Sequence, residues 1–342
     1  MKFDQLEHHT QIGFRNPEPG FDEKKFRDVI KWAIADRLKG KRPARPSSYN
    51  FKIVYDPESF QRHYEKPFAV TWIGHSSFLI SINGLHILTD PVWSNRASPF
   101  RTIGPRRLVA PAVPFADLPR IDIVLISHDH YDHLDLNTVR RLGNSPRYFI
   151  PLKLSPFFRR QGITNISEHD WWEKESYKNL DITATPAQHF SGRSFTNRNK
   201  TLWCGWVVRS DKINFYFAGD SGYFTGFREI GRRFGPLDVS FLPIGAYLPR
   251  WFMRPVHMSP EEAVQAWLDL GSDIFIATHW GTFDLADEPL DDPPIKLSQE
   301  ISRRELHREN FWLMQHGETR SLGITPDSSP PTGRFAVEIT NK

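Results

Sequence analysis

The sequence is poor in cysteine and has no long apolar runs. Cys204 is the one cysteine among 342 residues, which rules out an internal disulfide and a cysteine-rich zinc site. No uninterrupted apolar run reaches the roughly 18 residues that a membrane-spanning helix needs. The first residues, MKFDQLEHHTQIGF, lack the apolar centre of a secretory signal. We therefore expect a cytoplasmic protein, with peripheral attachment to a membrane as the alternative.

Opposite charges nearly balance over the whole chain, but one segment is strongly basic. The chain has 44 lysines and arginines against 40 acidic residues, a net charge of +4. Residues 24–45 are rich in lysine and arginine, and apolar residues recur there at helical spacing: Phe26, Ile30, Ala33, Ile34 and Leu38. The pattern predicts a basic amphipathic helix. Such a helix attracts nucleic acid, acidic protein or an anionic membrane surface, or it is simply a solvated face.

The distribution of apolar runs divides the chain into three parts. We predict an N-terminal arm over residues 1–66, one domain over residues 67–320 and a flexible tail over residues 321–342. Within the domain, strand-like runs come first and then alternate with helical ones, and Asn83-Gly84 indicates a tight hairpin. This order predicts an α/β fold in which two sheets pack together and helices cover them.

Several individual elements can be predicted as well. Ser259 precedes Pro260, and a glutamate stands three residues after the serine, so a helix should begin at Pro260 and end before Gly271. We expect a last helix over residues 297–308. His75 lies inside an apolar run that is typical of a strand, and we interpret it as a core histidine.

A string rich in histidine and aspartate follows the apolar run 121–126. It reads His-Asp-His-Tyr-Asp-His from 128 to 133. Side chains two apart point the same way in extended chain, so His128 and His130 can share one ion. Asp132 and His133 fall in the turn beyond, where they can face a second ion. Imidazole and carboxylate ligands without thiolate suit Zn²⁺, and also Mn²⁺ or Fe²⁺.

Four residues cannot complete two metal sites, so we expect more ligands at later strand ends. His189, Asp220 and His279 each follow or end a predicted strand, where a sheet presents reactive groups at its rim. Singly, each could be a hydrogen-bonded residue at a strand end. Together, in the same relation to their strands, they favour a site for two metal ions.

These motifs resemble the metallo-β-lactamase superfamily, through H-x-H-x-D-H, a later histidine, GDS at 219–221 and a final THWG. A narrower resemblance, over roughly residues 67–320, is to the N-acylphosphatidylethanolamine-hydrolysing phospholipase D family. It rests on the segments TWIGHSSFLI, LTDPVWSNRASP, LISHDHYDHLD, FAGDSGYF, HMSPEEAV and ATHWGTFDLADEP. The resemblance implies an αβ/βα sandwich, a zinc cofactor, and hydrolysis of a lipid phosphodiester to phosphatidic acid and an N-acylethanolamine.

The resemblance also implies roles for the ligands. A first zinc would be held by His128, His130 and His189. A second zinc would be held by Asp132, His133 and His279, and Asp220 would bridge the pair. A hydroxide between the two ions would attack the phosphorus, because a bound divalent cation lowers the pKa of water to about 7.

Other residues are candidates for contact with the substrate. The resemblance places His257 near the substrate phosphate, as a ligand or a proton donor; alternatively it only packs at a helix entry. Tyr247, Arg250 and Trp251 lie in the segment AYLPRWFM, whose apolar and cationic mixture suits a lipid phosphate. Asp90, which ends LHILTD, is expected to orient a ligand imidazole or to cap the next turn.

Three functions remain open from the sequence. The leading hypothesis is a phospholipase D-like enzyme that acts on lipids at an anionic membrane surface, with the basic segment as an interfacial anchor. A hydrolase of a soluble phosphodiester, ester or lactone would use the same ligands. A nuclease would need a further nucleic-acid-binding domain, for which there is little room, so we expect no nucleic-acid partner. A non-catalytic metal-stabilised protein is disfavoured, because all seven expected ligand positions are filled.

Overall fold

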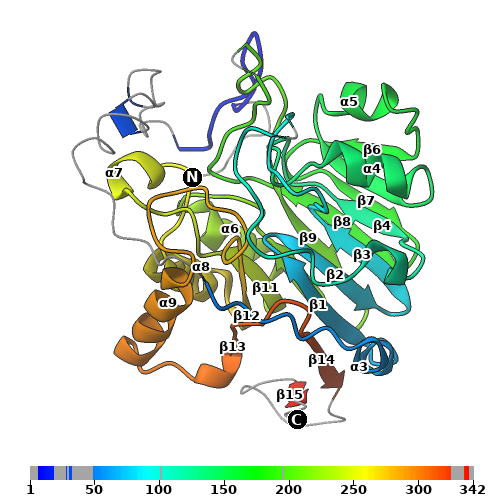
Figure 1. Cartoon of the computed structure of the whole chain (residues 1–342), viewed down its shortest axis with the longest axis vertical. Helices are drawn as coiled ribbons and strands as arrows, with labels where there is room; N and C mark the ends of the chain where they lie inside the picture. Colours follow the sequence, from blue (N-terminus) through cyan, green and yellow to red (C-terminus); the bar gives the residue numbers. More distant parts are fainter. Residues whose placement is uncertain are drawn as a thin grey trace.

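The computed structural model describes most of the chain, including all of the predicted central domain except two positions. The described residues are 7–18, 28, 31–32, 49–100, 102–194, 196–324 and 335–338. Within them the strands form two sheets that face each other, and helices cover the outer faces (Figure 1).

The first sheet contains the strands from the start and the end of the domain. Its order is β15 (Phe335–Glu338), β14 (Thr319–Ile324), β1 (Phe68–Gly74), β2 (Ser77–Ile82), β3 (Leu85–Thr89), β4 (Ile123–Leu125), β5 (Arg147–Pro151) and β6 (Ile166–His169). The second sheet runs β13 (Phe311–Trp312), β12 (Ser272–Thr278), β11 (Leu237–Pro243), β10 (Asn214–Phe217), β9 (Gly205–Arg209), β8 (Leu180–Thr185) and β7 (Lys174–Tyr177).

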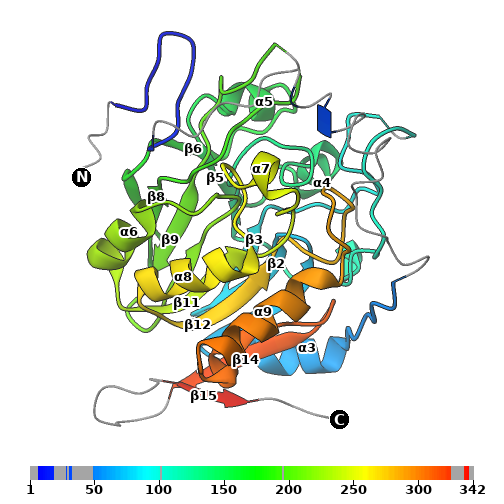
Figure 2. The same ribbon diagram turned by 90° about the vertical axis from the view of Figure 1, so that its left-hand side faces the viewer.

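Each sheet has its own helical cover. The outer face of the first sheet packs against α3 (Pro57–His63), α4 (Leu136–Leu142) and α5 (Ser155–Arg159). The second sheet is covered by α6 (Gly226–Phe234), α8 (Pro260–Leu270) and α9 (Asp292–Arg303). In Figure 2, α8 lies across β11 and β12, with α6 and α9 on either side of it. Short helices complete the chain: η2 (Phe115–Asp117), α7 (Arg250–Met253) and η3 (Arg308–Asn310). The predicted αβ/βα sandwich is confirmed.

Aromatic and branched side chains fill the space between the two sheets. The ring centre of Phe78 in β2 lies 5.0 Å from that of Phe241 in β11, and Phe68 faces Phe215 at 6.3 Å. Every residue of β1 and β11 is buried, because one face of each strand meets the other sheet and the opposite face meets helices or loops. The central core therefore fixes the two sheets relative to each other.

Parallel pairing brings several strand ends to one rim of the sandwich. Strands β3 to β6 pair in parallel in the first sheet, and β10 to β13 do so in the second. Strand β8 runs antiparallel to β9, which runs antiparallel to β10, so β8 and β10 point the same way. Polar residues that follow β4, β8, β10 and β12 can therefore meet at this rim.

The apolar run that contains His75 is a hairpin and not one strand. Strand β1 ends at Gly74, β2 begins at Ser77, and the two pair antiparallel with a register shift near the turn. Gly74 has a φ of 136° and His75 a φ of 58°, values that end an extended strand. The placement of His75 inside a strand is therefore wrong, although its side chain is buried and hydrogen-bonded, as expected of a core histidine. The backbone turns at His75, so its imidazole lies at the rim of the sandwich where the strand ends meet.

The start and end of α8 were predicted correctly from the sequence, whereas those of α9 were not. Helix α8 begins at Pro260, has a full capping box between Ser259 and Glu262, and ends at the left-handed Gly271, as predicted. The last helix was expected over residues 297–308 but spans residues 292–303. Its prolines lie in the first turn, where the backbone N–H has no helical partner, so they start the helix earlier than expected.

Both ends of the chain pack on the sandwich where they are described. Strand β14 pairs with β1 and continues beyond residue 320, and β15 pairs with β14, so part of the expected tail is sheet. In the expected arm, Phe14 is buried in the core between the sheets.

The predicted basic helix over residues 24–45 lies outside the described residues apart from positions 28, 31 and 32. Among the described residues, no helix is both long and apolar enough to cross a bilayer.

Candidate metal centre

Three histidines from two loops converge at the rim of the sandwich. His128 and His130 lie in the loop after β4, and His189 lies in the loop after β8. The His130 Nδ1 atom is 2.8 Å from His128 Nε2 and 3.2 Å from His189 Nε2. All three side chains are nearly or largely buried, so one cation could contact three imidazole nitrogens away from bulk water.

A second group of ligands lies beside the first. It contains Asp132 and His133 from the loop after β4, and His279, which follows β12 directly. Asp132 Oδ2 lies 3.5 Å from both His133 Nε2 and His279 Nε2. These three residues offer a carboxylate and two imidazoles, again a set that binds a divalent transition metal, and the imidazole of His75 lies within reach of the same place.

The carboxylate of Asp220 lies between the two groups. Its Oδ2 atom is 3.2 Å from His133 Nε2 and 3.1 Å from His279 Nε2. The same oxygen is 3.7 Å from His189 Nε2 and 4.0 Å from His128 Nε2. Asp220 follows β10 in the middle of the second sheet, so the strand order places a single carboxylate where both groups can share it.

Several buried polar atoms in this cluster point to a bound cation. Asp220 Oδ1, His133 Nε2 and His279 Nε2 have no hydrogen-bond partner among the described residues. Leaving buried polar atoms unpaired is costly, so such atoms need a ligand. The donor set of imidazoles and carboxylates matches zinc chemistry, and the residues present therefore fit a metal site.

The protonation of the first group suits metal binding. Burial lowers the pKa of His130 to about 4 and that of His189 to about 3, and it also lowers the pKa of His128 well below the usual range. The three rings are therefore neutral near pH 7. A neutral imidazole can donate a nitrogen lone pair to a cation, whereas a protonated one cannot.

The pKa values in the second group, Asp132, His133 and His279, together with Asp220, show that these carboxylates are stabilised by positive charge. Burial would raise the pKa of Asp132 and Asp220, but the charge on His133 and the hydrogen bonds from His133 and His279 together outweigh it and hold both pKa values well below the usual range. Conversely, burial would lower the pKa of His279, but Asp220 and Asp132 raise it to about 9. Two ionised carboxylates thus hold a proton on their histidine neighbours. A divalent cation would supply the same positive charge and displace those protons.

Residues behind the ligands fix their orientation. His133 Nδ1 donates to Asp90 Oδ2 at 2.7 Å, which leaves His133 Nε2 facing the other ligands. Ser127 donates to both oxygens of Asp90 through its backbone N–H and its hydroxyl. His189 Nδ1 donates to the carbonyl oxygen of Val256 at 2.9 Å. Each contact selects the nitrogen that stays available for a metal.

His75 is the residue near this site that the sequence reasoning missed. Its Nε2 atom lies 3.0 Å from Asp132 Oδ2, and its ring centre lies 4.1 Å from that of His279. The contact holds Asp132 in the second group of ligands. A glycine just before a histidine inside an apolar run was the available signal, because glycine there often marks a bend or a bulge.

The four residues expected to contact substrate lie in different settings. His257 Nδ1 is 3.9 Å from Asp220 Oδ2, and the side chain is partly exposed, so His257 lies at the mouth of the cluster. Tyr247 is buried and donates its hydroxyl to Asp292. Arg250 pairs with Glu262 and donates to the carbonyl oxygen of His257. Only His257 is brought together with the metal-ligand candidates; Arg250 supports the backbone behind it.

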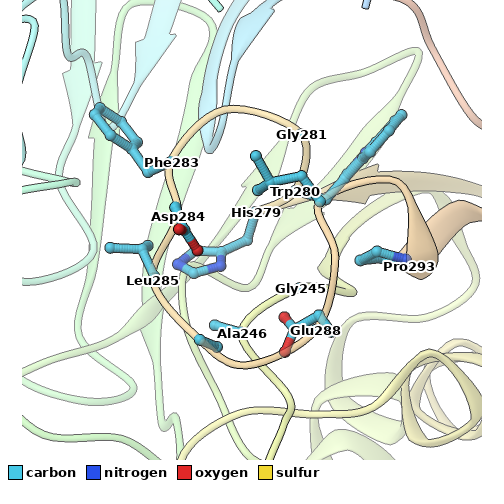
Figure 3. Close-up of a pocket in the computed structure, with 12 residues that line it drawn as sticks. Gly245, Ala246, His279, Trp280, Gly281, Phe283, Asp284, Leu285, Glu288 and Pro293 are labelled. Atoms are coloured by element: carbon cyan, nitrogen blue, oxygen red, sulfur yellow. The ribbon is translucent and has the colours of Figure 1, made fainter. Parts of the chain in front are cut away.

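Two further features lie near the candidate metal centre: the side chain of Trp251 and a small cavity beside His279. Trp251 lies on α7 with 40% of its surface exposed, and the Lys31 ammonium lies 4.4 Å from its ring centre. Next to His279 is a cavity of about 10 Å³, lined among others by Gly245 and Glu288 (Figure 3). That space holds roughly one water molecule.

Comparison with known proteins agrees with this geometry. A family model described as the β-lactamase superfamily domain matches residues 86–280, which make up more than half of the chain and include all seven candidate ligands. The chain belongs to the metallo-β-lactamase superfamily. Solved structures with a similar fold include a metallo hydrolase of Ignicoccus hospitalis (24% identity, TM-score 0.56, 74% of this chain and 97% of that chain). An isothiocyanate hydrolase from Delia radicum gut bacteria gives 20% identity and a TM-score of 0.60 over 73% and 97%.

Relatives within the superfamily have much higher sequence identity. An uncharacterized protein of Mycobacterium tuberculosis is 40% identical over 305 residues, which cover 86% of this chain and 79% of the relative. A Caenorhabditis elegans protein named N-acyl-phosphatidylethanolamine-hydrolyzing phospholipase D 1 is 38% identical over 75% and 76%. A mitochondrial Saccharomyces cerevisiae protein of the corresponding name is 37% identical over 68% and 51%. The chain is thus a metal-dependent hydrolase of this superfamily.

The contact between Asp90 and His133 gives a first prediction. Asp90→Asn should lower the affinity for zinc by about 10- to 100-fold, because the amide no longer fixes the ring orientation or basicity of His133. Competition with a chelator measures this affinity. Asp181→Asn, at an exposed carboxylate paired with Lys174, is the matched control and should bind zinc as the wild type does. Unchanged affinity in Asp90→Asn would refute the orienting role.

Proposed function

We propose that this chain is a zinc-dependent phosphodiesterase of the phospholipase D type. It hydrolyses N-acylphosphatidylethanolamine-like lipids to phosphatidic acid and an N-acylethanolamine. The observation that carries the proposal is the position of Asp220 between two groups of buried ligands, in a chain 38% identical to a protein named for this activity. A hydrolase of a soluble phosphodiester, ester or lactone remains the competing outcome of the experiments below.

In this proposal the seven ligands hold two zinc ions. His128, His130 and His189 would hold one ion. Asp132, His133 and His279 would hold the other, and Asp220 would contact both. Bound zinc would lower the pKa of water and stabilise the negative charge that develops on a phosphodiester during hydrolysis. Mn²⁺ or Fe²⁺ would suit the same ligands, so the identity of the metal is part of the proposal.

The chain's own residues position the reaction. The hydrogen bonds of Asp90 and Val256 hold His133 and His189 so that their Nε2 atoms face Asp220. The carboxylates of Asp132 and Asp220 stay ionised and can therefore hold the cations. Burial of the ligands limits bulk water around the reacting phosphorus and strengthens each electrostatic contact.

His257 is the residue we assign to the leaving group. It lies at the mouth of the cluster, 3.9 Å from Asp220 and with its ring centre 5.1 Å from that of His189. Burial lowers the pKa of His257 well below its usual range, so the ring is neutral before substrate arrives. A phosphodiester anion beside the ring would favour its protonated form. The ring could then donate a proton to the departing alkoxide, or it could bind the phosphate through N–H.

The exposed edge around α7 is where we place the lipid. Trp251 is exposed there, and Lys31 and Trp32 contact Trp251 and Phe252. Aromatic side chains with neighbouring cations suit the boundary between lipid headgroups and acyl chains. We therefore propose peripheral attachment at this edge, with phospholipid as substrate and an anionic membrane surface as partner.

Product analysis with an Asp220 variant tests the proposed function. Vesicles that contain N-acylphosphatidylethanolamine should yield phosphatidic acid and N-acylethanolamine with the zinc-loaded wild type, as read by mass spectrometry. Asp220→Asn should lower this turnover by on the order of 10³-fold or more, because the shared charge of the centre is lost. Release of other products, or faster cleavage of a soluble diester than of lipid, would overturn the lipid assignment. Near-normal turnover in Asp220→Asn would overturn the two-ion centre.

A change of leaving group tests the role of His257. His257→Ala should bind as much zinc as the wild type but cleave the lipid about 10²- to 10⁴-fold more slowly, the usual range for a lost general acid. With bis-p-nitrophenyl phosphate, whose leaving group needs no proton, the loss should be far smaller. An equal loss on both substrates would show that His257 binds phosphate and does not donate a proton. A loss of zinc would identify it as a metal ligand.

A further inference from the structure

A second cluster of metal-ligand side chains lies apart from the centre. His8 Nε2 is 2.6 Å from Asp170 Oδ1, and His9 Nε2 is 2.6 Å from Asp170 Oδ2. The three ligand atoms lie within 4.8 Å of one another, and none of the residues belongs to the groups around Asp220. His8 and His9 come from the described start of the chain, the dark blue loop of Figure 2, and Asp170 follows β6 directly.

The surrounding structure holds these side chains in place. His8 is 3% exposed, and its ring stacks on Trp171 with ring centres 4.1 Å apart. The backbone N–H of Trp171 donates to Asp170 Oδ1, which fixes the carboxylate. The loop of His8 and His9 is closed by the hydrogen bond from Arg15 N to His8 O. Two adjacent histidines therefore present the same ring nitrogen to one carboxylate.

The geometry resembles that of the proposed zinc centre. The His8 and His9 ring centres are 4.5 Å apart with planes at 69°, and those of His128 and His130 are 4.4 Å apart at 81°. Zinc bonds near 2.0 Å at tetrahedral angles set ligand atoms about 3.3 Å apart. The 2.6 Å spacings would thus open by roughly 0.7 Å around an ion. His9, with its partly exposed ring, can make that adjustment.

The local charge also favours a cation. Burial would raise the pKa of Asp170, but hydrogen bonds from His8 and His9 outweigh it and lower the pKa. The carboxylate is therefore ionised near pH 7. Glu173 accepts a hydrogen bond from the Asp170 backbone N–H at 2.8 Å, so a second carboxylate lies close to the cluster. Two imidazoles with a carboxylate select a divalent transition metal such as zinc rather than Mg²⁺ or Ca²⁺.

We propose that His8, His9 and Asp170 form a further metal-ion site, of the zinc class, that fastens the start of the chain to the end of β6. The site is structural, because its ligands come from two segments far apart in the sequence and the ion would join them. The fastened segment also contacts a loop of the candidate metal centre. Asn16, on the fastened segment, accepts a hydrogen bond at 2.9 Å from the backbone N–H of His189. The other interpretation is a metal-free cluster in which two histidines share one carboxylate by hydrogen bonds.

Zinc content measured as a difference separates this site from the centre. The full chain, saturated with zinc and then desalted, is analysed by native mass spectrometry. His9→Ala and Asp170→Asn should each hold about one zinc equivalent less than the wild type, whatever the number of ions in the centre. Asp220→Asn should keep the ion at Asp170. His307→Ala, at an exposed histidine that also faces a carboxylate, is the matched control and should lose nothing.

Hydrogen exchange provides the second readout and does not depend on activity. Added zinc should slow the exchange of the backbone amides of residues 8–15 in the wild type but not in His9→Ala. His9 is partly exposed, and His9→Gln serves as a second variant if the alanine protein misfolds. Equal zinc content in the wild type and in both cluster variants would overturn the proposal. So would exchange that ignores zinc, or an equal loss of zinc in His307→Ala, which would mark adventitious binding.

Discussion

The buried charge of Asp220 is the constraint on which the rest of the site depends. An ionised carboxylate inside a protein is stable only if positive charge and hydrogen-bond donors surround it. Here the Nε2 atoms of His128, His133, His189 and His279 all lie within 4.0 Å of one oxygen. The cluster can satisfy that charge by holding protons on histidine or by holding divalent cations. Only the second solution leaves the imidazoles neutral and provides a centre that activates water.

The two-sheet fold is what brings these atoms together. Asp220 and His279 come from the second sheet, whereas the string from His128 to His133 follows β4 of the first. The packed core between the sheets therefore sets the distance between the two halves of the centre. The hydrogen bonds that Ser127 and His133 donate to Asp90 extend that rigidity to the candidate ligands. The start of the chain adds a third support, since Asn16 contacts the backbone of His189.

The elements that local chemistry determines could be predicted from the sequence. Helix α8 has both of its end signals in the sequence. The candidate ligands could be picked out because they form a histidine- and aspartate-rich string after an apolar run or stand near the end of a later one. His75 could not, because an apolar run around Gly74 hides a turn that only the pairing of β1 with β2 reveals. The contacts of Tyr247 with Asp292 and of Arg250 with Glu262 could not be predicted either. Each joins two residues that lie on different elements and are separated by a dozen residues or more. Local sequence pattern does not reveal such tertiary pairing. The early start of α9 is a different case, because the prolines of its first turn are a local signal.

The central claim is that seven side chains hold two cations on either side of Asp220. Anomalous X-ray scattering at the zinc edge, from crystals of the zinc-loaded protein, tests it most directly. The account predicts two peaks in this cluster, roughly 3.5–4 Å apart as in other two-metal sites. One peak should lie against His128, His130 and His189, and the other against Asp132, His133 and His279, with the Asp220 carboxylate between them. A zinc-loaded crystal with no peak in the cluster, or with a single peak that Asp220 does not contact, would contradict it.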